Sequence, residues 1–259
     1  MEETTTIIGI DCAVEEKKTG VAVGWWDAGR LVLTSLPSLR EMRPVADCVC
    51  RILSGSKRTL IALDAPLGWP EDLGKFLAGH RAGRVLGQTA DLLFRRETDR
   101  FVRKCLRKQT LDVGADRIAR TAHAALNLLE TIRKRCGREI PLAWEPSFRN
   151  RDAAIEVYPA GTLIAHSLLP ASGYKKKDQL EVRRNILDRL KQKISFEVET
   201  SLAQHNADML DAIVCVLAGG DFLSGEALPP GDMGRAEKEG WIWVRKPPGE
   251  IRLPSDGCG

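Results

Sequence analysis

The stretch TTIIGID, at residues 5–11, is typical of a β-strand that ends in a carboxylate. It is rich in threonine and isoleucine, whose branched side chains favour extended structure. A second run, TLIAL at residues 59–63, is apolar apart from its first residue and is followed by Asp64, Pro66 and Gly68. Short apolar runs that are stopped by proline and glycine are typical of strands covered on both faces. We therefore expect residues 59–63 to be a buried strand that ends at Asp64.

Further β-rich runs lie on either side of these two. Residues 19–26 and 30–36 are joined by a short Asp-Ala-Gly turn, which predicts an antiparallel meander with the first strand. Apolar residues recur at helical spacing over residues 39–53. The run AAIEV, at residues 153–157, predicts another short strand that is stopped by proline.

Most of the remaining chain is predicted to be helical. A basic helical insert is expected over about residues 71–150, between the fourth and fifth strands. Further elements are expected as helices at 162–169, 175–193 and 206–217, the last stopped by Gly219 and Gly220, and as a final strand in GWIWVRKP. This order predicts an α/β fold over residues 1–259, with a five-stranded mixed sheet made of a three-strand antiparallel meander plus parallel strands and flanked by helices.

The composition indicates an ordinary globular protein, with 43% hydrophobic and 29% charged residues. Seven cysteines are scattered without a CxxC pair, which favours reduced thiols over a disulfide framework or a zinc site. The N-terminus lacks the features of a signal peptide, and no apolar stretch approaches the roughly 20 residues of a membrane helix. We therefore expect a soluble protein of the cytoplasm that has no membrane partner.

The positive charge is concentrated in one part of the chain. Residues 81–138 hold 15 lysines and arginines against 6 aspartates and glutamates, although the net charge of the whole chain is only +4. Such a block indicates an anionic partner, and nucleic acid is the first candidate. The alternative is a solvated helical surface with no partner. The sequence leaves the oligomeric state open, a homodimer included.

Four aspartates lie where regular elements begin or end. Asp11 and Asp64 end predicted strands, and ligands of open α/β sheets bind outside the carboxyl ends of strands. Asp208 and Asp211 are three residues apart, about 60° around one helix. Converging carboxylates repel one another unless divalent cations neutralise them, and oxygen ligands suit Mg²⁺ or Mn²⁺. Two such ions about 4 Å apart can promote phosphoryl displacement.

Each aspartate also has a simpler explanation. Asp208 lies in the first turn of a helix, where the macrodipole favours negative charge and Asn206 is a candidate N-cap. Asp11 and Asp64 are also common turn residues. Asp211 is the hardest to explain in this way, because the dipole effect fades within about one turn.

Several motifs, taken in order, resemble a family of predicted ribonuclease-H-like proteins, domain of unknown function 429. They are IIGID, TGVAV, LIALDAPLGWP, RRETDRFVRK, IEVYPAGT, NADMLDAIVCVLAG and EGWIWV, and they span roughly residues 5–245. The wider superfamily includes ribonuclease H, Holliday-junction resolvases and retroviral-type integrases. The resemblance implies a single ribonuclease-H-like domain that acts as a metal-dependent nuclease.

The resemblance also implies roles for individual residues. Four acids would form a catalytic, metal-binding cluster. Asp11 and Asp64 lie at two strand ends, and Asp208 and Asp211 lie on the last core helix. In the resolvase-like branch His205 would assist proton transfer, and Glu156 would be a further ligand. The chain departs from ribonuclease H proper after the third strand, where Glu41 is the only acid near the start of the next helix.

The family's insert carries a motif like RETDR, which here contributes four basic residues at helical spacing. We expect these residues to contact nucleic-acid phosphates: Arg96, Arg100, Arg103 and Lys104. The alternative is a row of surface ion pairs with acids such as Asp99, each worth only tenths of a kcal/mol.

Three functions are consistent with this sequence. The first is a nuclease that uses Mg²⁺ or Mn²⁺ and a carboxylate cluster. The second is an ATP-dependent phosphotransferase of the actin and sugar-kinase type, for which GVAVG at residues 20–24 is the only candidate phosphate loop. The third is a non-catalytic module that binds nucleic acid or protein.

Overall fold

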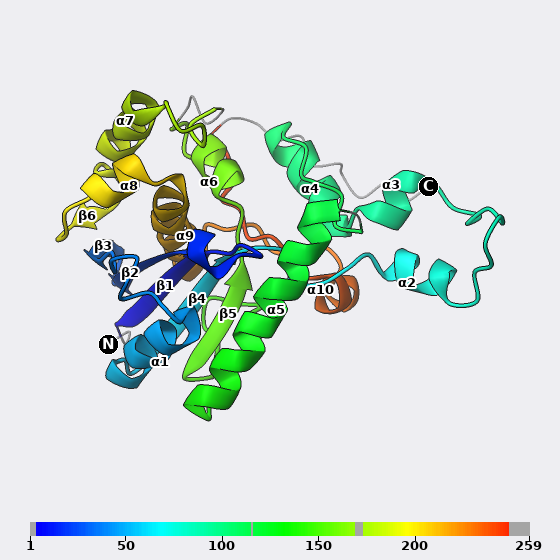
Figure 1. The fold of residues 1–259 in the computed structure, drawn as a ribbon, viewed down its shortest axis with the longest axis horizontal. Helices are drawn as coiled ribbons and strands as arrows, with labels where there is room; N and C mark the ends of the chain where they lie inside the picture. The colour runs from blue at the N-terminus through cyan, green and yellow to red at the C-terminus, as the bar shows by residue number, and fades with distance from the viewer. Residues whose placement is uncertain (1–3, 115, 169–172, 249–259) are drawn as a thin grey trace.

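One mixed sheet of six strands organises the chain in the computed structural model, which describes residues 4–114, 116–168 and 173–248. The strands lie in the order β5-β4-β1-β2-β3-β6 (Figure 1). Their bounds are β1 Thr5–Asp11, β2 Gly20–Asp27, β3 Arg30–Ser35, β4 Thr59–Asp64, β5 Asp152–Glu156 and β6 Ser195–Phe196. The predicted antiparallel meander is confirmed, because β1 pairs with β2 and β2 with β3 in that direction.

The parallel half of the sheet fixes where the strand ends meet. β4 pairs in parallel with β1 on one side and with β5 on the other. The register of β1 and β4 places Asp11 directly opposite Asp64. The last residues of these two strands therefore lie side by side at one edge of the sheet.

The sheet differs from the predicted one at both outer edges. The two-residue strand β6 pairs in parallel with β3 and makes six strands instead of five. The expected strand in GWIWVRKP is wrong, because this segment makes only isolated bridges, Glu156 with Ile242 and Ala227 with Arg245. Trp241 and Trp243 are nevertheless buried in an apolar cluster. Their apolarity therefore reflects packing under the sheet edge, not membership of the sheet.

Ten α-helices and one short 3₁₀ helix, η1 Glu16–Lys18, accompany the sheet in the described residues. The helices are α1 Val45–Gly55, α2 Glu71–Leu77, α3 Ala90–Phe94, α4 Glu97–Leu106, α5 Asp116–Cys136, α6 Pro159–Ala165, α7 Leu180–Leu190, α8 Ser201–His205, α9 Ala207–Leu223 and α10 Met233–Glu239. Across the described ranges, none is long and apolar enough to cross a membrane.

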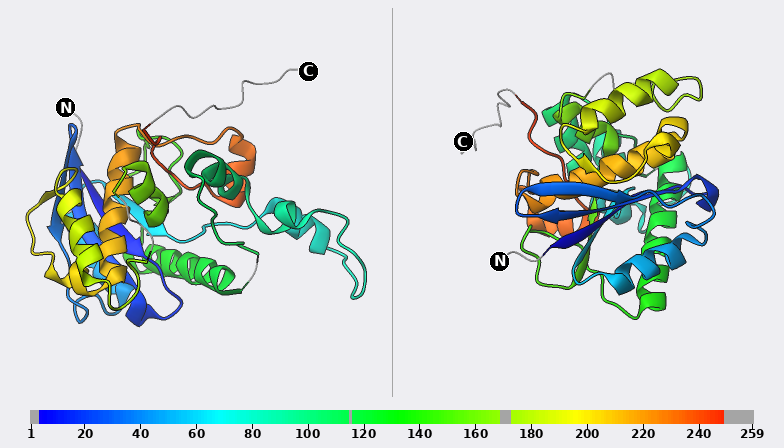
Figure 2. Two further views of the ribbon diagram at one scale, coloured as in Figure 1. Left: turned by 90° about the horizontal axis from the view of Figure 1, so that it is seen from above. Right: turned by 90° about the vertical axis from the view of Figure 1, so that its left-hand side faces the viewer.

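The helices form two layers around the sheet. α1 and α5 cover one face, whereas α9 lies on the other face together with α7 and α8 (Figure 2). α2 to α5 occupy the predicted insert between β4 and β5, and α2 and α3 project away from the sheet with the loop 78–89 (Figures 1 and 2). The insert is therefore divided between a helix that covers the sheet and a part that extends beyond it.

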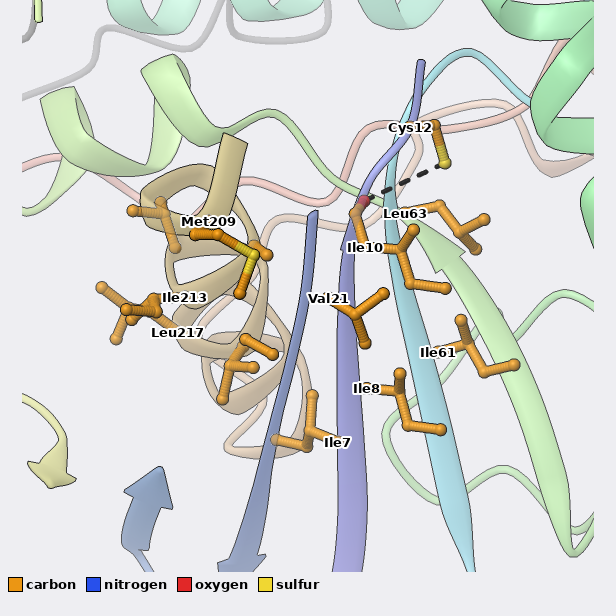
Figure 3. Packing of buried hydrophobic residues seen from close by; sticks show 14 of the residues in the cluster. Ile7, Ile8, Ile10, Cys12, Val21, Ile61, Leu63, Met209, Ile213 and Leu217 are labelled. Atoms are coloured by element: carbon orange, nitrogen blue, oxygen red, sulfur yellow. Dashed lines mark hydrogen bonds between the residues drawn. The ribbon is translucent and has the colours of Figure 1, made fainter. Parts of the chain in front are cut away.

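α9 packs on the sheet through small and apolar residues. Ala212 and Val216 lie against Gly9 of β1 and Gly219 lies against Ile7, whereas Ile213 and Leu217 are buried on the side of the helix that faces away from the strands (Figure 3). Burying side chains of this size contributes about 1.5–3 kcal/mol each. The approach is close at Gly9 of β1, where an added Cβ would lie 2.2 Å from the carbonyl oxygen of Ala212. A glycine at this position is therefore required for α9 to lie directly against β1.

The predicted end of α9 is wrong, because the helix continues through Gly219 and Gly220 to Leu223. A Cβ at Gly219 would lie 2.7 Å from a methyl group of Ile7, and one at Gly220 would lie 2.8 Å from a methyl group of Leu31. These glycines permit close packing on the sheet instead of ending the helix. The predicted N-cap is confirmed, since the side chain of Asn206 accepts a hydrogen bond from the Asp208 amide.

The expectation of reduced thiols is wrong for one pair of cysteines. Cys50 of α1 and Cys136 of α5 form a disulfide that joins two positions 86 residues apart in the chain. Sequence spacing could not reveal this pair, because the two helices become neighbours only when the insert folds back over the sheet. Four further cysteines of the described residues are free and buried, and Cys258 lies outside those residues.

Candidate metal centre

Three of the predicted acids converge at the carboxyl ends of β1 and β4. One carboxylate oxygen from each of Asp11, Asp64 and Asp211 lies within 4.8 Å of the other two. Asp11 is 8% exposed and Asp211 is fully buried, while Asp64 is half-buried. We call these three residues the acid cluster.

The pleat of the sheet explains why these side chains meet. Alternate residues of a strand point to the same face, and Gly9 of β1 faces α9, so Asp11 faces α9 as well. Asp64 pairs with Asp11 in register and therefore shares that face. Asp211 lies in the second turn of α9, which packs on the same strands. The cluster thus follows from strand register and from the placement of one helix.

Burial and mutual repulsion change the acidity of this cluster. Burial is the largest effect at Asp64 and raises the pKa of its carboxyl from the ordinary 3.8 to about 7. At Asp11, burial followed by repulsion from Asp211 and Asp64 raises the pKa well above its ordinary value. Close to neutral pH the cluster therefore holds protons unless a cation replaces them.

One loop supplies the neutralising groups that contact Asp211. The hydroxyl of Tyr174 donates a hydrogen bond of 2.6 Å to Oδ1, and Nζ of Lys175 lies 2.5 Å from Oδ2. Burial near the cluster opposes charge on Lys175, but attraction to Asp211, Asp64 and Asp11 outweighs it and raises the pKa of the lysine. The side chain of Lys175 is nevertheless 57% exposed. A single partly exposed cation thus faces three clustered carboxylates.

The acid cluster opens into a cavity of about 530 Å³. The strand ends contribute Asp11 and Asp64, and the loop before α7 contributes Tyr174 and Lys175. The opposite wall comes from the insert, namely Lys108, Thr110, Leu111, Val113, Ile118 and Thr121. A larger cavity of about 650 Å³ lies between α5 and the segment after β1, but none of the three acids lines it. The insert therefore adds a wall at the sheet edge, so that Asp11 and Asp64 lie in a partly open pocket.

Residues 9–234 match the family described as "Protein of unknown function (DUF429)". The chain belongs to this family. No curated protein and no solved structure matches it. The DUF429 match includes the last three residues of β1 and the whole of β4 and α9, so all three members of the acid cluster lie inside it.

Two of the other three predicted catalytic residues of this DUF429 chain, Asp208 and His205, lie apart from the cluster. Asp208, which was also expected to bind metal, is half-buried in the first turn of α9 and does not join the three converging oxygens. Burial raises the pKa of its carboxyl, and Lys175 opposes this rise. His205 is exposed at the end of α8, where its Nδ1 lies 2.8 Å from the carbonyl oxygen of Ser201. The structure does not bring His205 into the pocket lining.

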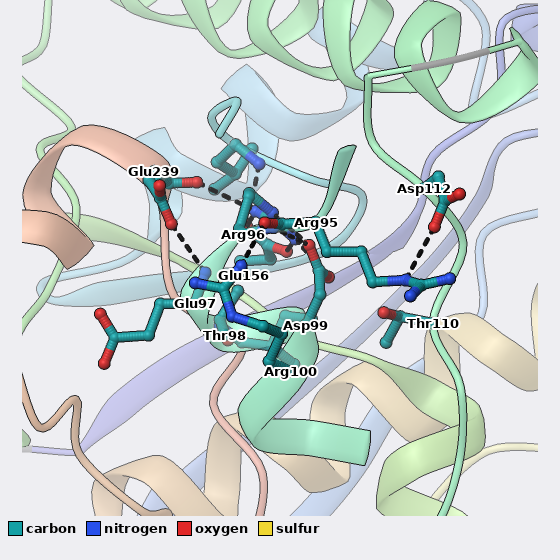
Figure 4. Close-up of polar contacts among 12 residues, drawn as sticks. Arg95, Arg96, Glu97, Thr98, Asp99, Arg100, Thr110, Asp112, Glu156 and Glu239 are labelled. Atoms are coloured by element: carbon teal, nitrogen blue, oxygen red, sulfur yellow. Dashed lines mark hydrogen bonds and ion pairs between the residues drawn. The ribbon is translucent and has the colours of Figure 1, made fainter. Parts of the chain in front are cut away.

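Glu156 belongs to a second group of buried charges, centred on Arg96 (Figure 4). The register pairs Glu156 with Leu63, so its side chain points to the face opposite Asp64. Both of its oxygens bind the Arg96 guanidinium, at 2.7 and 2.8 Å, and Oε2 also accepts from the Leu67 amide. Glu156 is therefore occupied by protein partners and is not a member of the acid cluster.

Arg96 was expected to contact phosphate, and its position in the structure contradicts this. It is 1% exposed, and its guanidinium also bonds both oxygens of Asp99 and the carbonyl oxygen of Glu239 (Figure 4). These five contacts use all five donors of the guanidinium. We call Arg96, Asp99 and Glu156 the arginine cluster. The RETDR motif thus supplies an internal ion pair instead of the surface row of charges that its spacing suggested.

The remaining basic residues of α4 have different surroundings. Arg100 is half-buried and donates to the carbonyl oxygen of Arg95 at 2.7 Å, whereas Arg103 and Lys104 are exposed. None of the three lines the pocket, but Lys108, just beyond α4, does. Sequence reasoning missed Lys108, Tyr174 and Lys175, because all three lie in connections whose course only the folded chain reveals.

The candidate phosphate loop of the phosphotransferase hypothesis is not a loop. Residues 20–24 lie within β2, which pairs with β1 along this length and with β3 from Val23 onward. Its backbone amides are therefore engaged in the sheet instead of being free to hold phosphate.

Proposed function

We propose that this DUF429 protein is a metal-dependent hydrolase of phosphodiester bonds in nucleic acid. The convergence of three carboxylate oxygens within 4.8 Å, two of whose residues line a pocket at the strand ends, carries the proposal. The strand order β3-β2-β1-β4-β5, with β2 antiparallel to its neighbours, supports a ribonuclease-H-like arrangement. In that arrangement the carboxyl ends of β1 and β4 hold the reactive groups.

The residues of the acid cluster fit a divalent cation. All three donors are carboxylate oxygens, which suit Mg²⁺ or Mn²⁺ better than softer metals. Oδ2 of Asp211 is buried and makes no hydrogen bond, although Lys175 lies close to it. Asp11, Asp64 and Asp211 would hold the ion, with Asp208 the nearest further acid on α9. A bound ion of this kind lowers the pKa of a water ligand and stabilises charge on a phosphoryl group.

The residues around the cluster have separate tasks in this proposal. Tyr174 fixes Oδ1 of Asp211 through its hydrogen bond, so the carboxylate keeps its orientation. Lys175 is partly exposed and charged at neutral pH, so it can turn from Asp211 to a phosphate oxygen of the substrate. Asp64, with a pKa of about 7, can take up or release a proton near neutral pH. These groups bind and orient the substrate and move protons.

The charge of the insert supports a nucleic-acid substrate. Arg103 and Lys104 are exposed on α4, and Lys108 lies in the pocket wall. Contacts of this kind with phosphates release counterions, so binding should weaken steeply as salt is raised. We therefore expect affinity for nucleic acid to fall with increasing ionic strength.

The proposal is tested by hydrolysis and by metal binding with one pair of variants. With millimolar Mn²⁺, the wild-type protein should hydrolyse bis(p-nitrophenyl) phosphate and single-stranded oligonucleotides, and EDTA should abolish this activity. Asp11→Asn should lower kcat/KM at least 1000-fold, about 4 kcal/mol of transition-state stabilisation. Calorimetry should show a matching loss of Mn²⁺ affinity.

The matched control is Asp188→Asn on α7, where the aspartate is exposed and paired with Lys191. This variant should keep both activity and Mn²⁺ binding. Hydrolysis that survives Asp11→Asn, or Mn²⁺ binding that is equal in the two variants, would overturn the proposal.

A further inference from the structure

The pocket holds a second set of polar groups, on the wall opposite the acid cluster. This wall is the connection between α4 and α5, where Lys108 and Thr110 line the cavity. Thr110 lies on this connection beside Asp112 (Figure 4). The acid cluster and this wall come from distant parts of the chain, so their meeting in one pocket is a product of the fold.

Thr110 has the features of a ligand-binding side chain. It is only 8% exposed, and its Oγ1 makes no hydrogen bond within the described part of the chain. A buried hydroxyl without a partner is costly, and native structures keep few of them. Because this hydroxyl borders the cavity, a bound molecule can supply the missing partner.

Lys108 adds a positive charge to the same wall. It is half-buried, and no carboxylate of the described residues forms an ion pair with it. By contrast, Lys175 is paired with Asp211, and every donor of Arg96 is used by protein acceptors. Lys108 is therefore a cation of this pocket that can bind an anion without first leaving a carboxylate of the described residues, and Thr110 lies two residues away from it.

The size of the pocket limits what can reach the acids. A volume of about 530 Å³ falls within the range of small-molecule sites, about 300–1,000 Å³. The major groove of a DNA duplex is alone about 12 Å wide. Asp11 and Asp211 are almost completely buried, so a duplex resting on the rim could not bring a phosphate to them. The half-buried ring of Tyr158 also lines the pocket and offers a surface on which a base can stack.

The geometry points to a terminal nucleotide of a single strand as the substrate unit of this pocket. The phosphodiester to be cut lies at the acid cluster, and the neighbouring phosphate binds Lys108 and Thr110. In the reaction, the oxygen of a water molecule bonds to phosphorus and the bond from phosphorus to the leaving sugar oxygen breaks. One proton from the water passes to that leaving oxygen. This inference rests on the proposed function and adds that the protein acts from strand ends.

The first experiment compares substrates of different topology in Mn²⁺. A linear single strand should be cleaved at least tenfold faster than a circular single strand of the same sequence or a blunt duplex. A difference below tenfold would overturn the inference. Bis(p-nitrophenyl) phosphate, which has no strand end, is the separate test: its hydrolysis supports the proposed function even when the end preference is absent. Two further substrates, a dinucleotide and a ten-nucleotide strand, show whether the protein acts on free dinucleotides or on the ends of polymers. A tenfold lower KM for the ten-nucleotide strand would identify polymer ends as the substrate.

The second experiment tests the opposite wall directly. Lys108→Ala and the isosteric Thr110→Val should each raise KM for the ten-nucleotide strand, about tenfold and about threefold, with kcat little changed. Neither should alter KM for bis(p-nitrophenyl) phosphate, which has no second phosphate. The control is Lys134→Ala, near the far end of α5, where the lysine pairs with Glu130. Unchanged KM values in both wall variants would overturn the assignment.

A binding measurement covers the case of slow turnover. In Mn²⁺, the unlabelled linear strand should displace a labelled dinucleotide from wild-type protein at least tenfold better than the circular strand does. Equal displacement would contradict end recognition, whatever the rate of hydrolysis.

Discussion

The pocket wall contains two groups of buried carboxylates that differ in how their charge is balanced. In the arginine cluster, Asp99 and Glu156 share a guanidinium whose donors are all used by protein acceptors. In the acid cluster, three carboxylates converge and the partly exposed Lys175 is the cation in contact with them. Asp11 and Asp64 line the same cavity as the arginine cluster, and Asp11 and Asp211 are buried like the members of that cluster.

The difference indicates which buried acids serve the fold and which are available for chemistry. In the arginine cluster two carboxylates share one guanidinium whose five donors are all used, so no donor is left for a ligand, and the cluster joins α4 to β5 and to the end of α10. In the acid cluster, burial and too few cations raise the pKa of Asp11 and Asp64 and destabilise the folded chain until protons or metal ions bind. The supply of protein hydrogen-bond donors to the carboxylates, not burial, therefore separates the two groups.

The largest effect is expected from breaking the arginine cluster. Arg96→Ala leaves Asp99 and Glu156 buried without their cation, so the free energy of unfolding should fall by about 3–5 kcal/mol. Urea denaturation at neutral pH measures this loss. Arg96→Lys keeps the charge but cannot make the two-pronged contacts, so it should recover only part of the stability. A loss below about 1 kcal/mol in Arg96→Ala would show that the carboxylates find other partners.

A smaller effect of opposite sign, a gain in the free energy of unfolding, is expected when Asp64 of the acid cluster is replaced by an uncharged residue in the absence of divalent cations. The pKa of Asp64 is about 7 in the folded chain against an ordinary 3.8, so folding favours its protonated form. The stabilisation from this proton is complete below about pH 4 and is lost as the pH rises towards 7. The free energy of unfolding of Asp64→Asn should therefore exceed that of the wild type by about 1–3 kcal/mol at pH 8, and the two should not differ in this way at pH 4. A difference in unfolding free energy between Asp64→Asn and the wild type that is the same at pH 4 and pH 8 would contradict this explanation.

The smallest effect is expected on the exposed side of α4. Arg103→Ala and Lys104→Ala remove charges that no buried group depends on, so the free energy of unfolding should change by less than about 0.5 kcal/mol. Thermal unfolding of these two variants and of Arg96→Ala compares the loss of stability at three basic residues of α4 and its N-cap. A loss in either variant as large as that of Arg96→Ala would mean that burial does not account for the special role of Arg96.

The sequence predicted the acid cluster because its members are tied to regular elements. Asp11 and Asp64 follow strands whose pairing is parallel, so their meeting needed only the strand order. Asp211 was the aspartate that the helix dipole explained least well, and it is the one that joins them. Asp208 is an equally good match to the pattern, but it lies one turn earlier and is half-buried beside the cluster.

The parts that the sequence did not predict depend on contacts between distant segments. The charges around Arg96 have the spacing of a solvated helix, and only the fold places Glu156 beside them, 60 residues further along the chain. Gly219 and Gly220 could equally end a helix or allow close packing, and local sequence does not distinguish these roles. Lys175 and Lys108 lie in connections, where periodicity gives no information on side-chain direction.

The close approach at Gly9 has a consequence for how this site tolerates change over evolution. Gly9 contributes no chemical group, yet a single methyl group there would press on the carbonyl oxygen of Ala212, the residue after Asp211. Relieving that clash requires α9 to move away from β1 and to carry Asp211 with it, away from Asp11. Selection for the position of the acids therefore acts on Gly9 as strongly as on the aspartates themselves. A mutational scan scored on activity would show this glycine among the least replaceable residues of the chain.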